Sequence, residues 1–280
     1  MSPTPRPCLL TRFLARAAIS IAALATYASD LLPTCPHHPI SFAYYEMGYA
    51  YSDAETVSRG TAKGIDKDLL DEMIKRTHCQ FRTAVYARAR TWHDLQSGDL
   101  DMASAAAETP ERDRFAWFAF YMIGKQYLIV GPTAPTSVKG MDDLLADPKM
   151  KLGVVRSFVH GKYFDDYVAR LRPLGRVLDY VDQDALYYAL QKGEVNAVFG
   201  LSFVYPLYID KFYLGKQVRV LDLDPTPGLK HGIVMSKSAF SEKDAEHWRA
   251  VVDGIRHDGT MQRIIARYLG EERARQMTGF

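Results

Sequence analysis

Several segments combine charged and aromatic side chains of the kinds that bind small ligands. Arg112 ends the run Thr109-Pro110-Glu111-Arg112, just after a predicted strand. A guanidinium presents two parallel donors to a carboxylate, which a lysine cannot do. The alternative is that Arg112 pairs with Glu111 or Asp113 at the start of a helix.

Tyrosines gather around the first predicted strand, at positions 44, 45, 49 and 51. Their rings could stack on a ligand or hold a cation, together with Phe158 and Phe199. Strand alternation sends only every second residue to one face, so many of these rings are expected in the core. Tyr45 is our single choice for the ligand wall.

The first residues have the pattern of a secretory signal peptide. Arg6, Arg12 and Arg16 precede an apolar run at 17–25 and the small residues around Ala28. We expect cleavage near Ala28, export to the periplasm, and a net charge that falls from +2 to about −1. This balance argues against a nucleic-acid partner. An uncleaved or membrane-anchored terminus is the alternative.

Two cysteines, Cys35 and Cys79, remain after the leader. A pair of cysteines in an oxidising compartment predicts a disulfide, with two buried free thiols as the alternative.

Strand and helix patterns alternate along the rest of the chain, which predicts an α/β fold with parallel strands. Strands are expected at 40–45, 81–86, 100–105, 126–130, 152–155, 177–180, 195–199, 218–223 and 232–235. Asp66 is expected to cap the helix that packs through Leu69 and Met73, and Ser241 to open a later helix with a capping box.

Five segments in order resemble the bacterial extracellular solute-binding proteins of family 3, the periplasmic receptors of polar amino acid ABC importers. They begin at Gly64, Leu95, Thr109, Gln191 and Asp258, and the resemblance runs from about 40 to 270. It implies a type 2 periplasmic-binding fold with two lobes and two hinge strands. We expect the first lobe at 29–130 plus 225–280 and the second at 131–224.

The resemblance also implies a ligand site in the cleft between the lobes. Arg112 matches the arginine that holds the ligand's carboxylate, and Leu201 stands where the family has an aspartate for the ligand's ammonium group. That departure indicates a ligand without an α-amino group, or a replacement acid such as Glu46 or Glu108. The remaining expected ligand contacts lie in the loops that face the cleft: Ala107, Thr109, Arg156, Ser157, Phe158 and Arg88. If both Arg88 and Arg90 point inward, a dicarboxylate or another polyanion becomes a more attractive ligand.

The leading interpretation is a monomeric receptor that captures a small carboxylate-bearing solute and passes it to an inner-membrane ABC permease. It needs no cofactor and no metal, and the sequence carries no nucleophile elbow or phosphate-binding glycine loop. A periplasmic lyase using Glu46 or Glu108 with His93 or His160 is the alternative from the enzyme class. A solute-sensing module is the third interpretation, although no transmembrane helix follows.

Overall fold

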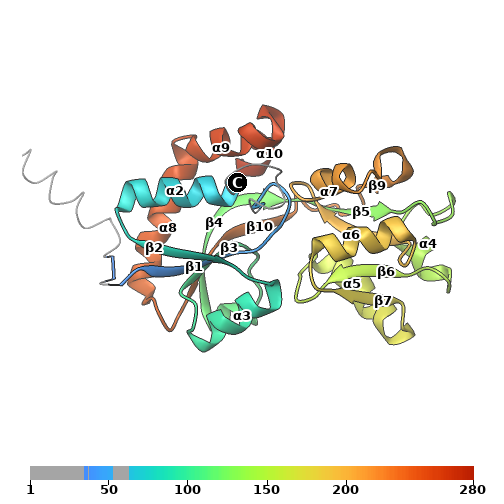
Figure 1. Ribbon diagram of the computed structural model, residues 1–280, viewed down its shortest axis with the longest axis horizontal. Helices are drawn as coiled ribbons and strands as arrows, with labels where there is room; N and C mark the ends of the chain where they lie inside the picture. The colour runs from blue at the N-terminus through green and yellow to red at the C-terminus, as the bar shows by residue number, and fades with distance from the viewer. Residues whose placement is uncertain (1–34, 37, 53–62) are drawn as a thin grey trace, which may run out of the picture.

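Two five-stranded sheets form the centres of two lobes (Figure 1). The computed structural model describes residues 35–36, 38–52 and 63–280, so the expected signal peptide lies outside the described residues. The first sheet has the order β2-β1-β3-β10-β4 and the second the order β7-β6-β8-β5-β9. The strands of the first sheet are β1 (Ile40–Tyr44), β2 (Phe81–Val85), β3 (Met102–Ala106), β4 (Ala116–Gly124) and β10 (Leu229–Ser236). Those of the second are β5 (Gln126–Val130), β6 (Leu152–Val155), β7 (Val177–Tyr180), β8 (Ala197–Leu201) and β9 (Arg219–Leu221).

Helices cover both faces of each sheet, which confirms the expected α/β class. In the first lobe, α2 (Ile65–Thr77), α8 (Glu242–His257) and α9 (Thr260–Leu269) share one apolar core, and α3 (Arg88–Ser97) packs on the other face. A short helix, α10 (Glu271–Thr278), follows and lies against α9 and β4. The helices of the second lobe are α4 (Met141–Ala146), α5 (Lys162–Leu171), α6 (Gln183–Lys192) and α7 (Tyr205–Lys211). Three 3-10 turns complete the elements: η1 (Arg112–Arg114), η2 (Arg172–Leu174) and η3 (Gly215–Gln217).

The chain crosses between the lobes twice. It leaves the first sheet at Gly124 and enters the second at Gln126, and it returns between β9 and β10. The expected boundary of the first lobe at residue 130 is not where the chain crosses, because residues 126–130 form β5 of the second sheet. β5 pairs with β8 and β9, so the first crossing lies at Lys125.

The strand directions differ from the expected parallel arrangement. β1, β2 and β3 are parallel, as are β6, β7 and β8, whereas β10 and β5 run antiparallel to their neighbours. β4 was not predicted at all, although it pairs with β10 over eight residues. β10 is the strand by which the chain returns to the first lobe, and β5 is the strand by which it enters the second.

Two local predictions have different outcomes. The capping box at Ser241 is present, with both reciprocal hydrogen bonds to Asp244. Asp66 does not cap its helix, which begins at Ile65 after Gly64. Its carboxylate is buried instead and accepts a hydrogen bond of 2.5 Å from the Tyr121 hydroxyl.

The predicted disulfide joins Cys35 to Cys79. It ties the segment that enters β1 to the turn that enters β2, two adjacent parallel strands. The disulfide therefore links the starts of β1 and β2 covalently.

Candidate functional site

Arg112 lies at the start of η1, directly after the loop that follows β3, and its side chain is buried. One guanidinium nitrogen donates to the Ala107 carbonyl at 2.8 Å, and the other donates to the Ser157 carbonyl at 2.9 Å. Ala107 belongs to the first lobe and Ser157 to the loop between β6 and α5 in the second. The arginine therefore bridges the two lobes.

The Arg112 guanidinium also lies flat against Trp92, with its central carbon 3.8 Å from the ring centroid. Arg88 lies one turn before Trp92 on α3, and its central guanidinium carbon is 5.3 Å from the centroid of the Trp92 ring. Arg88 also stacks on Tyr45 at 4.1 Å and on Phe158 at 5.5 Å. Two buried arginines thus share an aromatic cage made of residues from both lobes.

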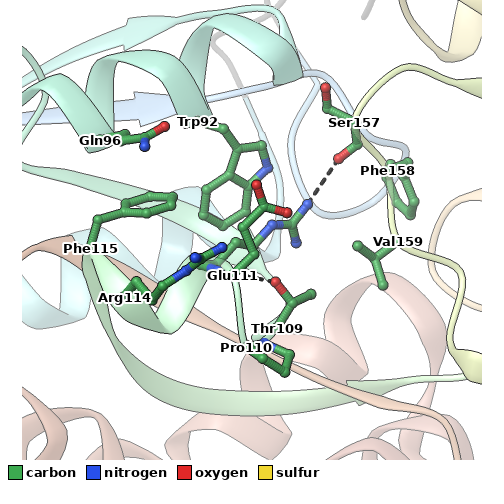
Figure 2. A pocket seen from close by; sticks show the side chains of 11 residues that line it. Trp92, Gln96, Thr109, Pro110, Glu111, Arg114, Phe115, Ser157, Phe158 and Val159 are labelled. Atoms are coloured by element: carbon green, nitrogen blue, oxygen red, sulfur yellow. Dashed lines mark hydrogen bonds between the residues drawn. The ribbon is translucent and has the colours of Figure 1, made fainter.

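A cavity of about 900 Å³ opens beside Arg112 (Figure 2). Trp92 stands in the middle of the view, with Gln96 and Phe115 on one side and Phe158 and Val159 on the other. The first lobe supplies most of its wall and the second lobe supplies 157–159. The remaining lining residues are Thr109, Pro110, Glu111 and Arg114.

Burial makes the charges at this site costly. Desolvation, together with the smaller effect of the nearby Arg88 charge, lowers the pKa of Arg112 to about 9. Desolvation also lowers the pKa of Arg88. Within the described part of the chain, neither guanidinium has a carboxylate within 4.0 Å. Positive charge is concentrated here without an acidic partner from those residues.

The structure brings part of the expected site together. Thr109, Ser157 and Phe158 line the cavity with Arg112, and the Thr109 hydroxyl accepts from the Arg112 backbone amide. The Ala107 carbonyl accepts a hydrogen bond from the Arg112 guanidinium.

Three other expected residues lie around a second, smaller cavity of about 180 Å³. Tyr45, Glu46 and Arg88 line it, together with Asp182 at the start of α6. Tyr45 is buried, and its hydroxyl donates to the Met47 sulfur at 2.9 Å. Burial raises the pKa of Tyr45 to about 12.

Some expected residues lie outside both of these cavities. Arg156 is exposed, and Leu201 is buried in the core at the end of β8. Glu108 lines a separate cavity beside the C-terminal Phe280. Arg90 points away from Arg88 and pairs on the surface with Asp94.

The other aromatic and histidine candidates pack against neighbouring residues or lie on the surface. Tyr44 stacks on Tyr51, and Phe199 packs against Phe164 within the second lobe. His160 is buried beside the Gln126 amide, and desolvation lowers its pKa to about 3. His93 is exposed next to Asp94.

Trp92 is the main residue that sequence reasoning missed. It lies four residues after Arg88 in α3, so both side chains share one face of the helix. An arginine and a tryptophan at this spacing are a signal for cation–π contact that could have been used. Gln96, Arg114, Phe115 and Val159 were also missed.

The described residues contain no group of three or more histidine, cysteine, aspartate or glutamate side chains placed to hold a metal ion. None of the helices formed by the described residues has the length and apolar character needed to cross a membrane.

Two α/β lobes joined by two crossings, with a cavity at their junction, define a two-lobed ligand-binding fold. The chain belongs to the bacterial extracellular solute-binding proteins, family 3, which it matches over residues 46–271. None of the curated proteins compared with the sequence matches it.

Solved structures share this fold at low sequence identity. An ancestral arginine-binding protein bound to glutamine is 20% identical, with a TM-score of 0.69, covering 84% of this chain and 100% of its own. The arginine-, lysine-, histidine-binding protein ArtJ from Geobacillus stearothermophilus is 21% identical, with a TM-score of 0.66 and coverages of 83% and 96%. A histidine kinase sensor domain with similarity to periplasmic binding proteins is 14% identical, with a TM-score of 0.69 and coverages of 84% and 97%.

Proposed function

We propose that this chain is a periplasmic solute-binding protein that captures a small carboxylate-bearing solute between its lobes and delivers it to an inner-membrane ABC permease. The observation that carries the proposal is the buried Arg112 guanidinium, which faces a cavity at the lobe junction and has no carboxylate partner among the described residues. A buried cation without an anionic partner is unfavourable, and a ligand carboxylate would supply that partner.

Lobe closure fits the contacts of Arg112. The arginine holds a carbonyl on each lobe, so a carboxylate that takes the place of the Ser157 carbonyl would connect the lobes through the ligand. Thr109 and Ser157 would add polar contacts, and Phe158 and Trp92 would supply apolar walls. The protein is proposed to release its ligand chemically unchanged and to act as a monomer.

A ligand screen tests the proposal. Thermal unfolding of the purified protein would be followed with amino acids, keto acids, dicarboxylates and polyamines. We expect a carboxylate to raise the melting temperature and to be recovered intact after incubation. Arg112→Ala should weaken binding by about 10- to 150-fold, the value of one charged hydrogen-bonded contact. Arg170→Ala, an exposed arginine on α5, is the matched control and should bind normally.

Conversion of the ligand during incubation would support the lyase alternative instead. Unchanged affinity in the Arg112→Ala variant would show that Arg112 does not bind the ligand, and this would contradict the proposal.

A sensing role is the second candidate, favoured by the structural likeness to the histidine kinase sensor domain. Deletion of the gene separates the roles. A receptor for uptake predicts loss of ligand import, whereas a sensor predicts normal import and loss of the transcriptional response to the ligand.

A further inference from the structure

A second arginine, Arg88, shares the environment of Arg112 although it lies on a different element. Arg88 is the first residue of α3, and only 4% of its surface is exposed. The Tyr45, Trp92 and Phe158 rings surround its guanidinium, and the Trp92 ring also carries Arg112. Two positive charges are therefore held next to each other at the junction of the lobes.

Most of the hydrogen-bonding capacity of these arginines is unused. A guanidinium has five N–H donors. Among the described residues, Arg88 donates only to the Ala105 carbonyl, at 3.2 Å, and its buried Nε has no partner. Arg112 donates to two carbonyls through its side chain. Arg112 lines the larger cavity and Arg88 lines the smaller one, so each arginine borders a cavity at the lobe junction.

The acids near the two arginines do not neutralise them. Asp66 is the buried acid that interacts electrostatically with Arg88, and its carboxylate is already engaged by the Tyr121 hydroxyl. Glu111 and Asp165 interact electrostatically with Arg112, but neither forms an ion pair with it within 4.0 Å. Glu111 lines the cavity and is exposed, and the Asp165 carboxylate accepts from the His160 amide. Two buried like charges without close carboxylates cost free energy that one monoanion cannot offset for both.

We propose that Arg88 and Arg112 together form a two-guanidinium site that selects small dicarboxylates without an ammonium group. This inference rests on the proposed function and names its ligand class. Each carboxylate would take one guanidinium, and the Trp92, Tyr45 and Phe158 rings would enclose the short carbon chain between them.

The lining of the larger cavity supports the second half of the proposal. An ammonium group moved into a buried site needs an anionic or carbonyl partner. Glu111 is the one acid that lines this cavity among the described residues, and it is exposed to solvent. Glu46 and Asp182 line the smaller cavity beyond Arg88, so a ligand with a long cationic side chain is the competitor that the test must include.

Isothermal titration calorimetry provides the test. Succinate and glutarate would be compared with butyrate, which has one carboxylate, and with glutamate and arginine, which carry ammonium groups. We expect at least one dicarboxylate to bind about tenfold or more tightly than butyrate and both amino acids.

Variants assign that preference to Arg88. Arg88→Gln should weaken dicarboxylate binding by about 10- to 150-fold and change butyrate binding by less than about threefold. Arg112→Gln should weaken both. Arg90→Gln is the matched control, because Arg90 lies on the same helix but pairs with Asp94 on the surface. If Arg88→Gln does not fold, Arg88→Lys keeps the charge, loses the forked geometry, and should still weaken dicarboxylate binding about tenfold.

The outcomes separate this inference from the proposed function. Equal binding of succinate and butyrate, with both lost in Arg112→Gln, would overturn the two-guanidinium site and leave the carboxylate receptor standing. Tightest binding of arginine or glutamate would do the same. Failure of every carboxylate to bind would overturn both.

Discussion

The guanidinium of Arg112 donates a hydrogen bond of 2.9 Å to the backbone carbonyl of Ser157, from one lobe to the other. Ser157 presents that carbonyl because its backbone has a left-handed φ of 60°. The same arginine is the residue proposed to hold the ligand. Lobe closure without ligand and ligand capture therefore compete for one side chain.

Substitutions at Ser157 test this cross-cleft contact. Ser157→Pro fixes φ near −65° and moves the carbonyl away from Arg112, so the unliganded protein should populate open forms more and show a larger radius of gyration in solution scattering. Ser157→Gly keeps the left-handed conformation and should match the wild type. An unchanged radius in the proline variant would show that the contact does not hold the lobes together.

Gly48 forms a second contact between the lobes, close to the crossings. Its φ is +55°, and a Cβ there would meet Val204 Cα at 2.6 Å. Next to it, the Tyr49 amide donates to the Phe203 carbonyl at 2.9 Å. Gly48→Ala should lower the free energy of unfolding by about 2–4 kcal/mol, from the left-handed penalty and from the steric clash.

Gly175→Ala is the control for Gly48→Ala in urea unfolding. Gly175 has a similar φ of +67°, but open space surrounds its Cβ position. This variant should lose only about 1–2 kcal/mol. Equal losses in the two variants would mean that the clash with Val204 is relieved by movement.

The buried Asp66 predicts a dependence of stability on pH. Desolvation raises the pKa of Asp66 from 3.8 to about 6. Between these pH values the folded protein keeps a proton that the unfolded chain has released, so this group makes the free energy of unfolding fall as pH rises. The total effect is on the order of 1–3 kcal/mol and is complete above about pH 7.

Asp66→Asn isolates this effect. The buried histidines His160 and His231 act in the opposite direction, since desolvation lowers their pKa values to about 3 and about 4. Their contribution is common to both proteins. The free energy of unfolding of Asp66→Asn minus that of the wild type should therefore rise from about pH 4 to about pH 7 and then level. A difference that does not change with pH would contradict the burial of an ionisable Asp66.

The disulfide closes a loop with a sequence separation of 44 residues. In the chain-entropy description, such a link stabilises the fold by about 4 kcal/mol. Replacing both Cys35 and Cys79 with alanine should lower the melting temperature, and reductant should lower the wild type to a similar value without affecting the variant. Wild-type stability that is insensitive to reductant under unfolding conditions would contradict the link.

The α/β class followed from the alternation of short apolar runs with amphipathic segments, and five ordered motifs indicated the family. β4 was missed because its sequence, from Ala116 to Gly124, is almost uniformly apolar and has no alternation to separate a strand from a buried helix. The role of Asp66 was missed for a related reason. A capping aspartate and a buried one have the same local sequence, and its partner Tyr121 lies 55 residues away.

The candidate site was predictable where one motif supplies several residues, as around Arg112. The site was not predictable where the orientation of a helix decides which of its side chains face the cleft. Arg88 and Arg90 are two residues apart, so they point to different sides of α3, and the sequence does not say which one faces the cleft. Trp92 was missed because its place between Arg88 and Arg112 depends on how α3 packs on the sheet.

The structure of the protein with a carboxylate ligand is the most direct test of the central claim. We predict two ligand oxygens at about 2.7–2.9 Å from the Arg112 guanidinium, with the ligand between residues of both lobes. A ligand bound elsewhere, with Arg112 still donating to the Ser157 carbonyl, would contradict it.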